Sequence, residues 1–252
     1  MNFFFGFKHK KFNTSLTIPK FQNRKKKISN YKLYQYYIDE NKWKISEVID
    51  SSYDDFYLIN QDKTSNEKVY FLADEQQINK GSKNKLINYN NFTDTTPEYR
   101  SNLQVSIKNG GFSSYQSDYP FKMVPIKGSI LSPLSSLCNK DADANSIFLK
   151  NIYELPIHDE FGAFFVNIKT KRVLKKIVVV TNFLNEIIVE KEFIKPEVFL
   201  FTDKYIGIPI FCSIKDNHIS LEHTHPPHEY IMNDDRFRIV NELKKEFREI
   251  IT

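Results

Sequence analysis

Residues 162–201 read GAFFVNIKTKRVLKKIVVVTNFLNEIIVEKEFIKPEVFLF, and this stretch decides the fold. Its apolar segments are separated by short polar links, among them Lys169–Arg172 and Asn182–Asn185. Parallel strands need a crossover of about a dozen or more residues, usually a helix, whereas antiparallel strands need only a tight turn. Because no link leaves room for a crossover helix, the stretch predicts a sheet of antiparallel strands.

The same succession of apolar segments continues on both sides of this stretch. It covers residues 147–153 before it and residues 206–223 after it. Further upstream, residues 103–107 alternate apolar and polar side chains, which is the period of a half-buried strand. We therefore expect residues 99–252 to form the main domain, which is mainly β and built as an antiparallel β-sandwich or a jelly-roll-like fold.

The end of the chain changes period. From Asp234 onward, apolar side chains recur at steps of three and four residues, which is the mark of one helical face. Asn233 or Asp234 suits the N-cap of a helix, and Asp235 suits the positive end of its dipole. The pattern predicts a C-terminal amphipathic α-helix that lies across a sheet or seals one end of it. Its apolar face is expected to consist of Phe237, Val240, Leu243, Phe247 and Ile250.

The first part of the chain has weaker patterns. We expect residues 1–30, which are first aromatic and then basic, to be an N-terminal arm. Apolar side chains in residues 31–38 predict a strand, and residues 31–98 are expected to be a smaller β-containing region packed on or preceding the main domain. Residues 74–97 are polar and lack periodicity, so the boundary between the two units is expected there.

The net charge of +5 is unevenly distributed along the chain. Residues 1–44 contain eleven Lys or Arg and two acidic residues, a balance of +9, whereas the other 208 residues contain 25 basic and 29 acidic ones, a balance of −4. Basic residues beside Phe3, Phe4, Phe5 and Phe7 are compatible with an anionic membrane surface or a nucleic acid as a partner of the arm. The alternative is a solvated arm whose phenylalanines pack on the body.

The cysteines and the N-terminus bear on the cellular compartment. Cys138 and Cys212 lie far apart and form no CxxC pair, which favours free thiols in a reducing environment. Residues 1–10 are apolar too briefly for a secretory signal. No segment approaches the roughly 20 apolar residues that a membrane span needs. We therefore expect a cytoplasmic protein.

The densest group of chemically versatile side chains lies near the C-terminus. Four of the six histidines fall within residues 218–228. If a strand runs to His225, then His223 and His225 project from the same face, because strand side chains repeat every two residues. Two imidazoles and the nearby carboxylate of Glu229 suit a divalent transition metal such as Zn, Mn or Fe. The expected ligands are His223, His225 and Glu229, completed by His158 or His228.

The spacing His-x-His-x-x-x-Glu in residues 223–229 resembles the first metal motif of cupin-type barrels. The resemblance covers these seven residues. Asn217 and Arg236 stand where that motif has flanking glycines, and the C-terminal segment contains no histidine for a second motif. The alternative is that the histidines are surface and capping groups at a strand-to-helix junction.

A second candidate site lies in the middle of the chain. Asn109-Gly110-Gly111 favours a tight turn, because Asn and Gly tolerate positive φ. Hydroxyl and amide side chains then alternate with aromatic ones as far as Phe121, a composition suited to a sugar or another polar ligand. The alternative is a hairpin with a polar outer face. The expected substrate-binding residues are Ser114, Tyr115, Asp118 and Tyr119.

Two functions follow from these observations. The first is a metal-dependent enzyme, in which the histidine-bound metal polarises or deprotonates a group on a small polar or sugar-derived substrate. The second is a non-catalytic β-rich binding or assembly module that recognises a glycan or a partner protein, with the histidines in structural roles. Neither the reaction type nor the oligomeric state can be derived from the sequence.

Overall fold

The computed structural model describes residues 1–23, 26–27, 31–48, 53–78, 83–89, 100–223 and 234–251. The described chain is mainly β and ends in a helix, as predicted. Its strands form four sheets of four or five strands and one separate strand pair. Neighbouring strands within the four sheets are antiparallel throughout, which confirms the inference from the short links.

Within each sheet, the strands pair in an order that differs from their order along the chain. Sheet 1 pairs β11 (Asp118–Pro120), β1 (Asn2–Phe4), β8 (Val69–Asp74), β5 (Tyr31–Asp39) and β6 (Lys42–Glu47) in that order. Sheet 2 pairs β10 (Phe112–Tyr115), β9 (Asn102–Ile107), β2 (Phe12–Pro19) and β7 (Phe56–Asn60). Sheet 3 pairs β12 (Leu131–Pro133), β17 (Val198–Thr202), β14 (Glu160–Asn167) and β15 (Arg172–Val180). Sheet 4 pairs β16 (Leu184–Ile188), β13 (Ala144–Lys150), β18 (Ile208–Lys215) and β19 (His218–His223). The other elements are β3 (Phe21–Asn23), β4 (Lys26–Lys27), α1 (Glu75–Ile78), α2 (Asp234–Ile251) and two 3-10 turns, Phe121–Met123 and Lys191–Phe193.

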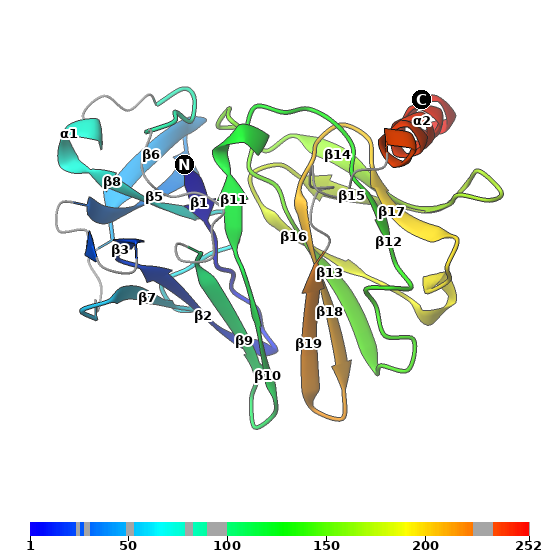
Figure 1. Ribbon diagram of the computed structural model, residues 1–252, viewed down its shortest axis with the longest axis horizontal. Helices are drawn as coiled ribbons and strands as arrows, with labels where there is room; N and C mark the ends of the chain where they lie inside the picture. Colours follow the sequence, from blue (N-terminus) through cyan, green and yellow to red (C-terminus); the bar gives the residue numbers. More distant parts are fainter. Residues whose placement is uncertain are drawn as a thin grey trace.

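The four sheets are arranged as the four blades of a β-propeller ring, so the predicted β-sandwich or jelly-roll-like fold is wrong. Sheets 1 and 2 occupy the left half of Figure 1, and sheets 3 and 4 the right half. The link between β13 of sheet 4 and β14 of sheet 3 contacts sheet 1, where the Glu154 carbonyl accepts hydrogen bonds from Trp43 Nε1 of β6 and from Leu86 N–H, both at 2.9 Å. Antiparallel strands with short links are common to all these architectures. Long-range pairing decides between them.

The N-terminal residues are built into the first two sheets. β1 lies between β8 and β11, and β2 lies between β7 and β9. Each of these two sheets therefore combines strands from the expected arm, from the expected smaller region and from the expected main domain. The division expected near residue 98 does not coincide with a boundary between sheets.

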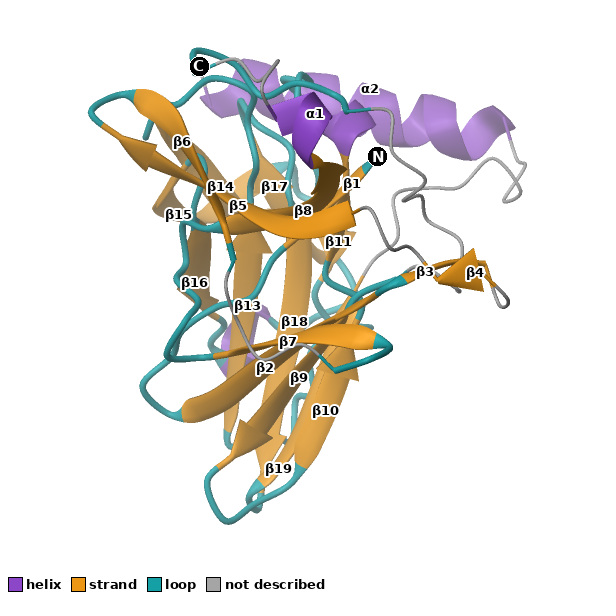
Figure 2. Ribbon diagram, turned by 90° about the vertical axis from the view of Figure 1, so that its left-hand side faces the viewer, coloured by secondary structure: helices purple, strands orange, loops and turns teal. Residues whose placement is uncertain are grey.

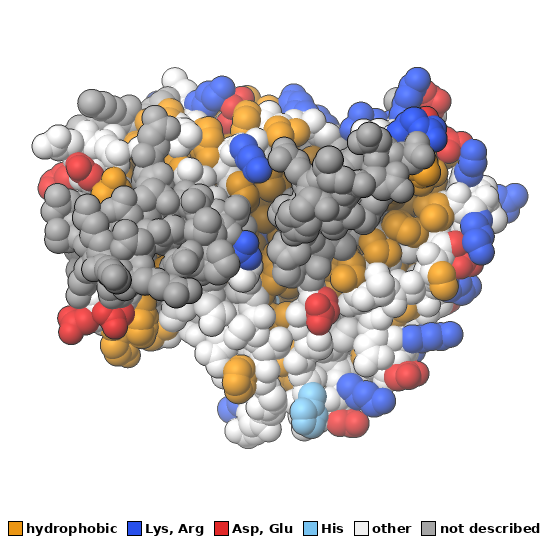
Figure 3. All heavy atoms as spheres, viewed as in Figure 1, with side chains coloured by type: hydrophobic (Ala, Val, Ile, Leu, Met, Phe, Trp, Pro, Cys, Tyr) orange, Lys and Arg blue, Asp and Glu red, His pale blue; other side chains and the backbone are white. Residues whose placement is uncertain are grey.

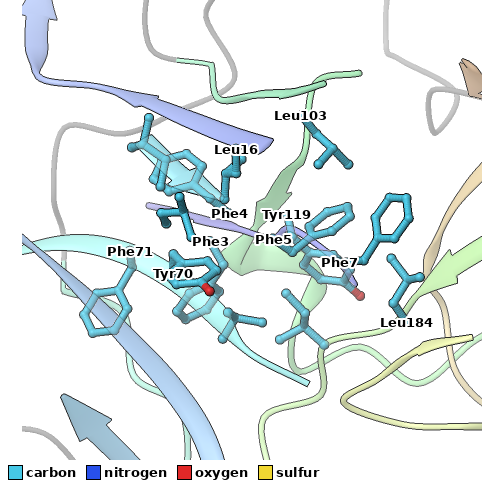
Figure 4. Packing of buried hydrophobic residues seen from close by; sticks show 14 of the residues in the cluster. Phe3, Phe4, Phe5, Phe7, Leu16, Tyr70, Phe71, Leu103, Tyr119 and Leu184 are labelled. Atoms are coloured by element: carbon cyan, nitrogen blue, oxygen red, sulfur yellow. The ribbon is translucent and has the colours of Figure 1, made fainter. Parts of the chain in front are cut away.

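The phenylalanines near the N-terminus belong to the hydrophobic core. Phe3, Phe4 and Phe5 are fully buried, and Phe7 is only 1% exposed. Figure 4 shows them among Tyr70, Phe71, Tyr119, Leu103 and Leu184, which come from three of the four sheets. This agrees with the interpretation in which these rings pack on the body, and it leaves none of the four rings exposed to a membrane surface.

The C-terminal helix α2 covers the outer face of sheet 3, as predicted from its amphipathic pattern. Phe247 is fully buried against Phe164, Val166 and Phe201. Figure 2 shows α2 along the top of the molecule, and Figure 3 shows apolar side chains of sheet 3 continuing beside it. Ile250 is 46% exposed, contrary to the prediction. In the described part of the chain, neither helix combines the length and hydropathy that a membrane span requires.

Candidate functional site

The predicted metal ligands fall largely outside the described residues. This holds for His225, His228 and Glu229. His223 is the last residue of β19, where its backbone pairs in register with Ile210. His158 is exposed in the link between β13 and β14. Within the described ranges, no three His, Cys, Asp or Glu side chains are grouped so that they would hold a metal ion. The metal site stays a prediction.

The metal prediction has a direct test. Protein purified without chelator is expected to contain stoichiometric zinc, manganese or iron by elemental mass spectrometry, and the double variant His223→Ala/His225→Ala is expected to lose it. His218→Ala is the matched control, because His218 Nδ1 instead lies 2.9 Å from the carbonyl oxygen of Asp216. A metal-free wild-type protein whose melting temperature ignores all three added metals would contradict the prediction.

The predicted substrate-binding residues do not share one exposed surface. Tyr115, Asp118 and Tyr119 are buried, and Ser114 alone is exposed. The Asp118 carboxylate accepts hydrogen bonds from the N–H and hydroxyl of Ser101, at 3.0 and 2.9 Å. Burial raises the pKa of Asp118 to about 6, and these hydrogen bonds partly oppose that rise. The carboxylate therefore fixes the start of β11 to the residues before β9.

The structure does bring the two predicted segments together. The hairpin of β9 and β10 lies beside that of β18 and β19, where Gly111 N–H donates to the Asn217 carbonyl at 2.8 Å and Leu221 N–H to Ser113 Oγ at 3.2 Å. A Cβ on Gly110 would lie 2.5 Å from the same carbonyl, so glycine is required there by close backbone approach. The predicted turn is confirmed, with a φ of 60° at its asparagine.

A groove that the sequence did not predict lies between the β1–β2 segment and sheet 4. It consists of two adjoining hollows, of about 280 and 480 Å³, and His9 lines both. We call the two hollows together the His9 groove. The smaller hollow is lined among others by Lys11, Phe12, Ser146, Glu186, Ile188 and Lys191. The larger hollow is lined among others by Lys8, Lys10, Asn66, Glu67 and Phe183.

Strand alternation and aromatic packing build this groove. Ser146 and Phe148 point to the same face of β13, and Ile188 and Glu186 lie opposite them on β16. Phe7 stacks on Phe148 with ring centroids 4.9 Å apart. Because of this stack, the segment between β1 and β2 lies on the face of sheet 4, and His9 lies beside Glu186.

The polar side chains in the groove hold one another in place. His9 Nε2 lies 3.3 Å from one oxygen of the Glu186 carboxylate, and Ser146 Oγ donates to the other at 3.1 Å. His9 Nδ1 accepts the Lys11 backbone N–H at 3.2 Å, so in the neutral imidazole Nε2 carries the hydrogen that Glu186 accepts. The His9 ring also stacks on Phe12, with centroids 4.4 Å apart.

This arrangement differs from a nucleophile–base relay. In such a relay the base contacts the nucleophile directly and a third group orients the base. Here the Glu186 carboxylate stands between Ser146 and His9, and each of them binds it separately. The geometry therefore fixes side chains beside a hollow instead of activating the Ser146 hydroxyl.

Comparisons with protein-family models, with curated proteins and with solved structures gave no match.

Proposed function

We propose that this chain is a non-catalytic binding module whose ligand occupies the His9 groove. The observation that carries the proposal is the mutually fixed set of His9, Glu186 and Ser146 beside an exposed apolar side chain, Ile188. Ligand sites typically combine apolar lining with a few polar groups held in fixed orientations. Side chains that are already ordered lose little further conformational freedom when a ligand binds.

The positions of the perturbed groups also support a non-catalytic role. Active sites concentrate groups whose pKa values are strongly shifted. Burial raises the pKa of Asp118 to about 6 and lowers the pKa of Lys150 to about 7. Both side chains are buried, and neither lines the groove. Their shifts are therefore consequences of core burial and provide no acid or base to a ligand in the groove.

The test is ligand selection with a matched pair of surface variants. A displayed peptide library and a glycan array are each probed with the immobilised chain. Ligands selected on the wild type are expected to bind Ile188→Glu on the order of tenfold more weakly or worse, because the new carboxylate lies in the groove. Val178→Glu is the control: Val178 is 58% exposed and Ile188 55%, but Val178 lies on β15, outside the groove.

Two outcomes would overturn the proposal. One is that neither the library nor the array yields a ligand. The other is that selected ligands bind both glutamate variants equally well. Thermal unfolding of the two variants should be similar, because both positions are exposed.

A further inference from the structure

The His9 groove runs beside an open sheet edge. Among the strands that the structure describes, β16 is the end strand of sheet 4 and pairs with β13 alone. The Phe183 carbonyl accepts the Asn151 N–H at 3.2 Å, and Val189 N–H donates to the Asn145 carbonyl at 3.0 Å. In an antiparallel ladder, alternate residues direct their backbone groups to the same neighbouring strand. The odd-numbered residues of this segment therefore face β13.

The even-numbered residues of β16 direct their backbone groups away from the sheet. Leu184 N–H donates to the Asn66 carbonyl at 2.9 Å, in the link between β7 and β8. For the N–H groups of Glu186 and Ile188, the described chain provides no hydrogen-bond partner. Asn66 thus occupies the position that one residue of a further strand would have. Beyond Asn66, at Glu186 and Ile188, the edge of β16 is open among the described residues. Figure 2 shows β16 along the left margin of the molecule.

The acidic side chains of the groove already have partners. Glu186 binds His9 and Ser146, and Glu190 forms an ion pair with Lys175. Asp143 accepts the backbone N–H of Asp216 at 3.0 Å. Glu67 interacts electrostatically with the buried amine of Lys150.

The lysines of the groove are different. Four exposed ammonium groups line it, and none forms an ion pair with the described residues. Two of them line the larger hollow, where they outnumber the single carboxylate of Glu67, and two line the smaller one, where the carboxylates of Asp143 and Glu186 lie beside them. The four are Lys8 and Lys10 at one end, and Lys11 and Lys191 at the other.

We infer that the occupant of the groove is an extended segment of a partner protein, acidic at the end that reaches Lys8 and Lys10, that adds a strand to the open edge of β16. This rests on the proposed function. Main-chain hydrogen bonds supply affinity in strand addition, and side chains of alternate residues supply specificity. Here the backbone of the segment pairs with Glu186 and Ile188. An apolar residue of the segment lies opposite Ile188, since directly opposed side chains contact one another. The acidic end of the segment reaches Lys8 and Lys10.

The experiment uses a labelled synthetic peptide with a Val-Thr-Val centre and glutamates at one end, and its binding to the full chain is measured by fluorescence anisotropy. Methylating the backbone nitrogens that face β16 is expected to weaken binding about fivefold to tenfold per hydrogen bond removed. Methylating the alternate nitrogens is expected to have little effect, since these point to solvent. A peptide of the same composition in scrambled order is expected to bind more weakly than the designed one.

The charge part of the inference is tested by a swap. Lys8→Glu/Lys10→Glu is expected to weaken binding of the acidic peptide and to strengthen binding of a peptide with lysine at the corresponding end. Lys169→Glu, an exposed lysine in the β14–β15 turn, is the control. Higher salt should reduce the difference between the variants, because exposed charges are screened.

The outcomes separate this inference from the proposed function. Suppose that Ile188→Glu abolishes binding of a selected peptide, whereas methylating its backbone nitrogens in either register does not weaken binding. The proposed binding module is then supported and strand addition is refuted. A selected glycan whose binding is lost in Ile188→Glu would likewise support the binding module and refute strand addition. If the lysines only guard the edge against self-association, the Lys8→Glu/Lys10→Glu variant oligomerises while peptide binding is unaffected, and the inference is refuted.

Discussion

Replacing Lys150 by methionine is expected to stabilise the protein at neutral pH, by on the order of 3 kcal/mol of unfolding free energy. Lys150 is completely buried at the end of β13. Its ammonium donates to the Asn66 carbonyl at 2.9 Å and lies 5.9 Å from the centroid of the Phe5 ring. Methionine fills a similar volume without a charge. The Asn66 carbonyl keeps its hydrogen bond from Leu184, so it is not left unpaired.

The effect depends on pH with a definite sign. Burial lowers the pKa of Lys150 from 10.5 to about 7, and Glu67 opposes this only in part. Between these two values the unfolded chain binds more protons than the folded one, so wild-type stability rises with pH across this window. Lys150→Met removes this contribution. Its advantage over the wild type is therefore largest below about pH 7 and shrinks toward about pH 10.

Urea unfolding at about pH 6, below both pKa values, and at about pH 9, between them, measures the difference. Lys169→Met serves as the control, because it removes an exposed lysine and is expected to change stability by less than about 0.5 kcal/mol at either pH. If Lys150→Met destabilised the protein at both pH values, the lysine would be a net stabilising contact and the argument from burial would be wrong.

The position of Lys150 connects stability with the proposed site. The Asn66 carbonyl that binds its amine also binds the Leu184 N–H of β16, and Asn66 Oδ1 accepts the Lys8 backbone N–H at 3.0 Å. One residue thus joins the β1–β2 segment, the β7–β8 link and sheet 4 at the end of the open edge. A buried amine that lowers stability at this position is a local conflict of the kind that proteins retain near functional sites.

The sequence predicted the local structure of the C-terminal half well. The apolar segment that begins at Gly162 was expected to be a strand, and residues 162–167 lie in β14 (Glu160–Asn167); the step pattern after Asp234 marks α2. Single strands and helices such as these depend on the period of the apolar side chains and on the length of the links, within about ten residues of the chain. They do not decide how many separate ladders the strands form, because that depends on pairs such as Phe12 with Ile107, far apart along the chain. The sandwich prediction failed at this step.

The His9 groove lay beyond local patterns for the same reason. His9 and Glu186 are 177 positions apart, and Ser146 and Glu186 are 40 apart. One signal was present: Phe12, Leu16 and Ile18 alternate with polar residues and form the buried side of β2. That alternation predicts a strand within the segment interpreted as an arm. Residues 1–30 were instead interpreted from their aromatic and basic composition, so no strand was predicted there.

Replacing Phe7 by alanine is expected to destabilise the protein by about 3–5 kcal/mol, as is usual when a buried phenylalanine is truncated. Phe7 is 1% exposed and stacks on Phe148 of sheet 4. Phe112→Ala is the control, since Phe112 is 67% exposed and its loss should cost less than about 0.5 kcal/mol. Chemical denaturation measures both. If residues 1–30 were a peripheral arm, Phe7→Ala would lower the free energy of unfolding as little as Phe112→Ala.

A double-mutant cycle with Phe148→Ala extends this test to cooperativity. Residues in contact couple by about 0.5–3 kcal/mol, so the two losses are expected not to add. The Phe7–Phe148 stack joins the N-terminal segment to sheet 4, and Phe5 and Phe12 extend the same contact. Sheets 1 and 2 should then unfold together with sheets 3 and 4 in a single transition, seen alike by fluorescence and circular dichroism. Two separate transitions in the wild type would show that the interface around Phe7 contributes little to holding the blades together.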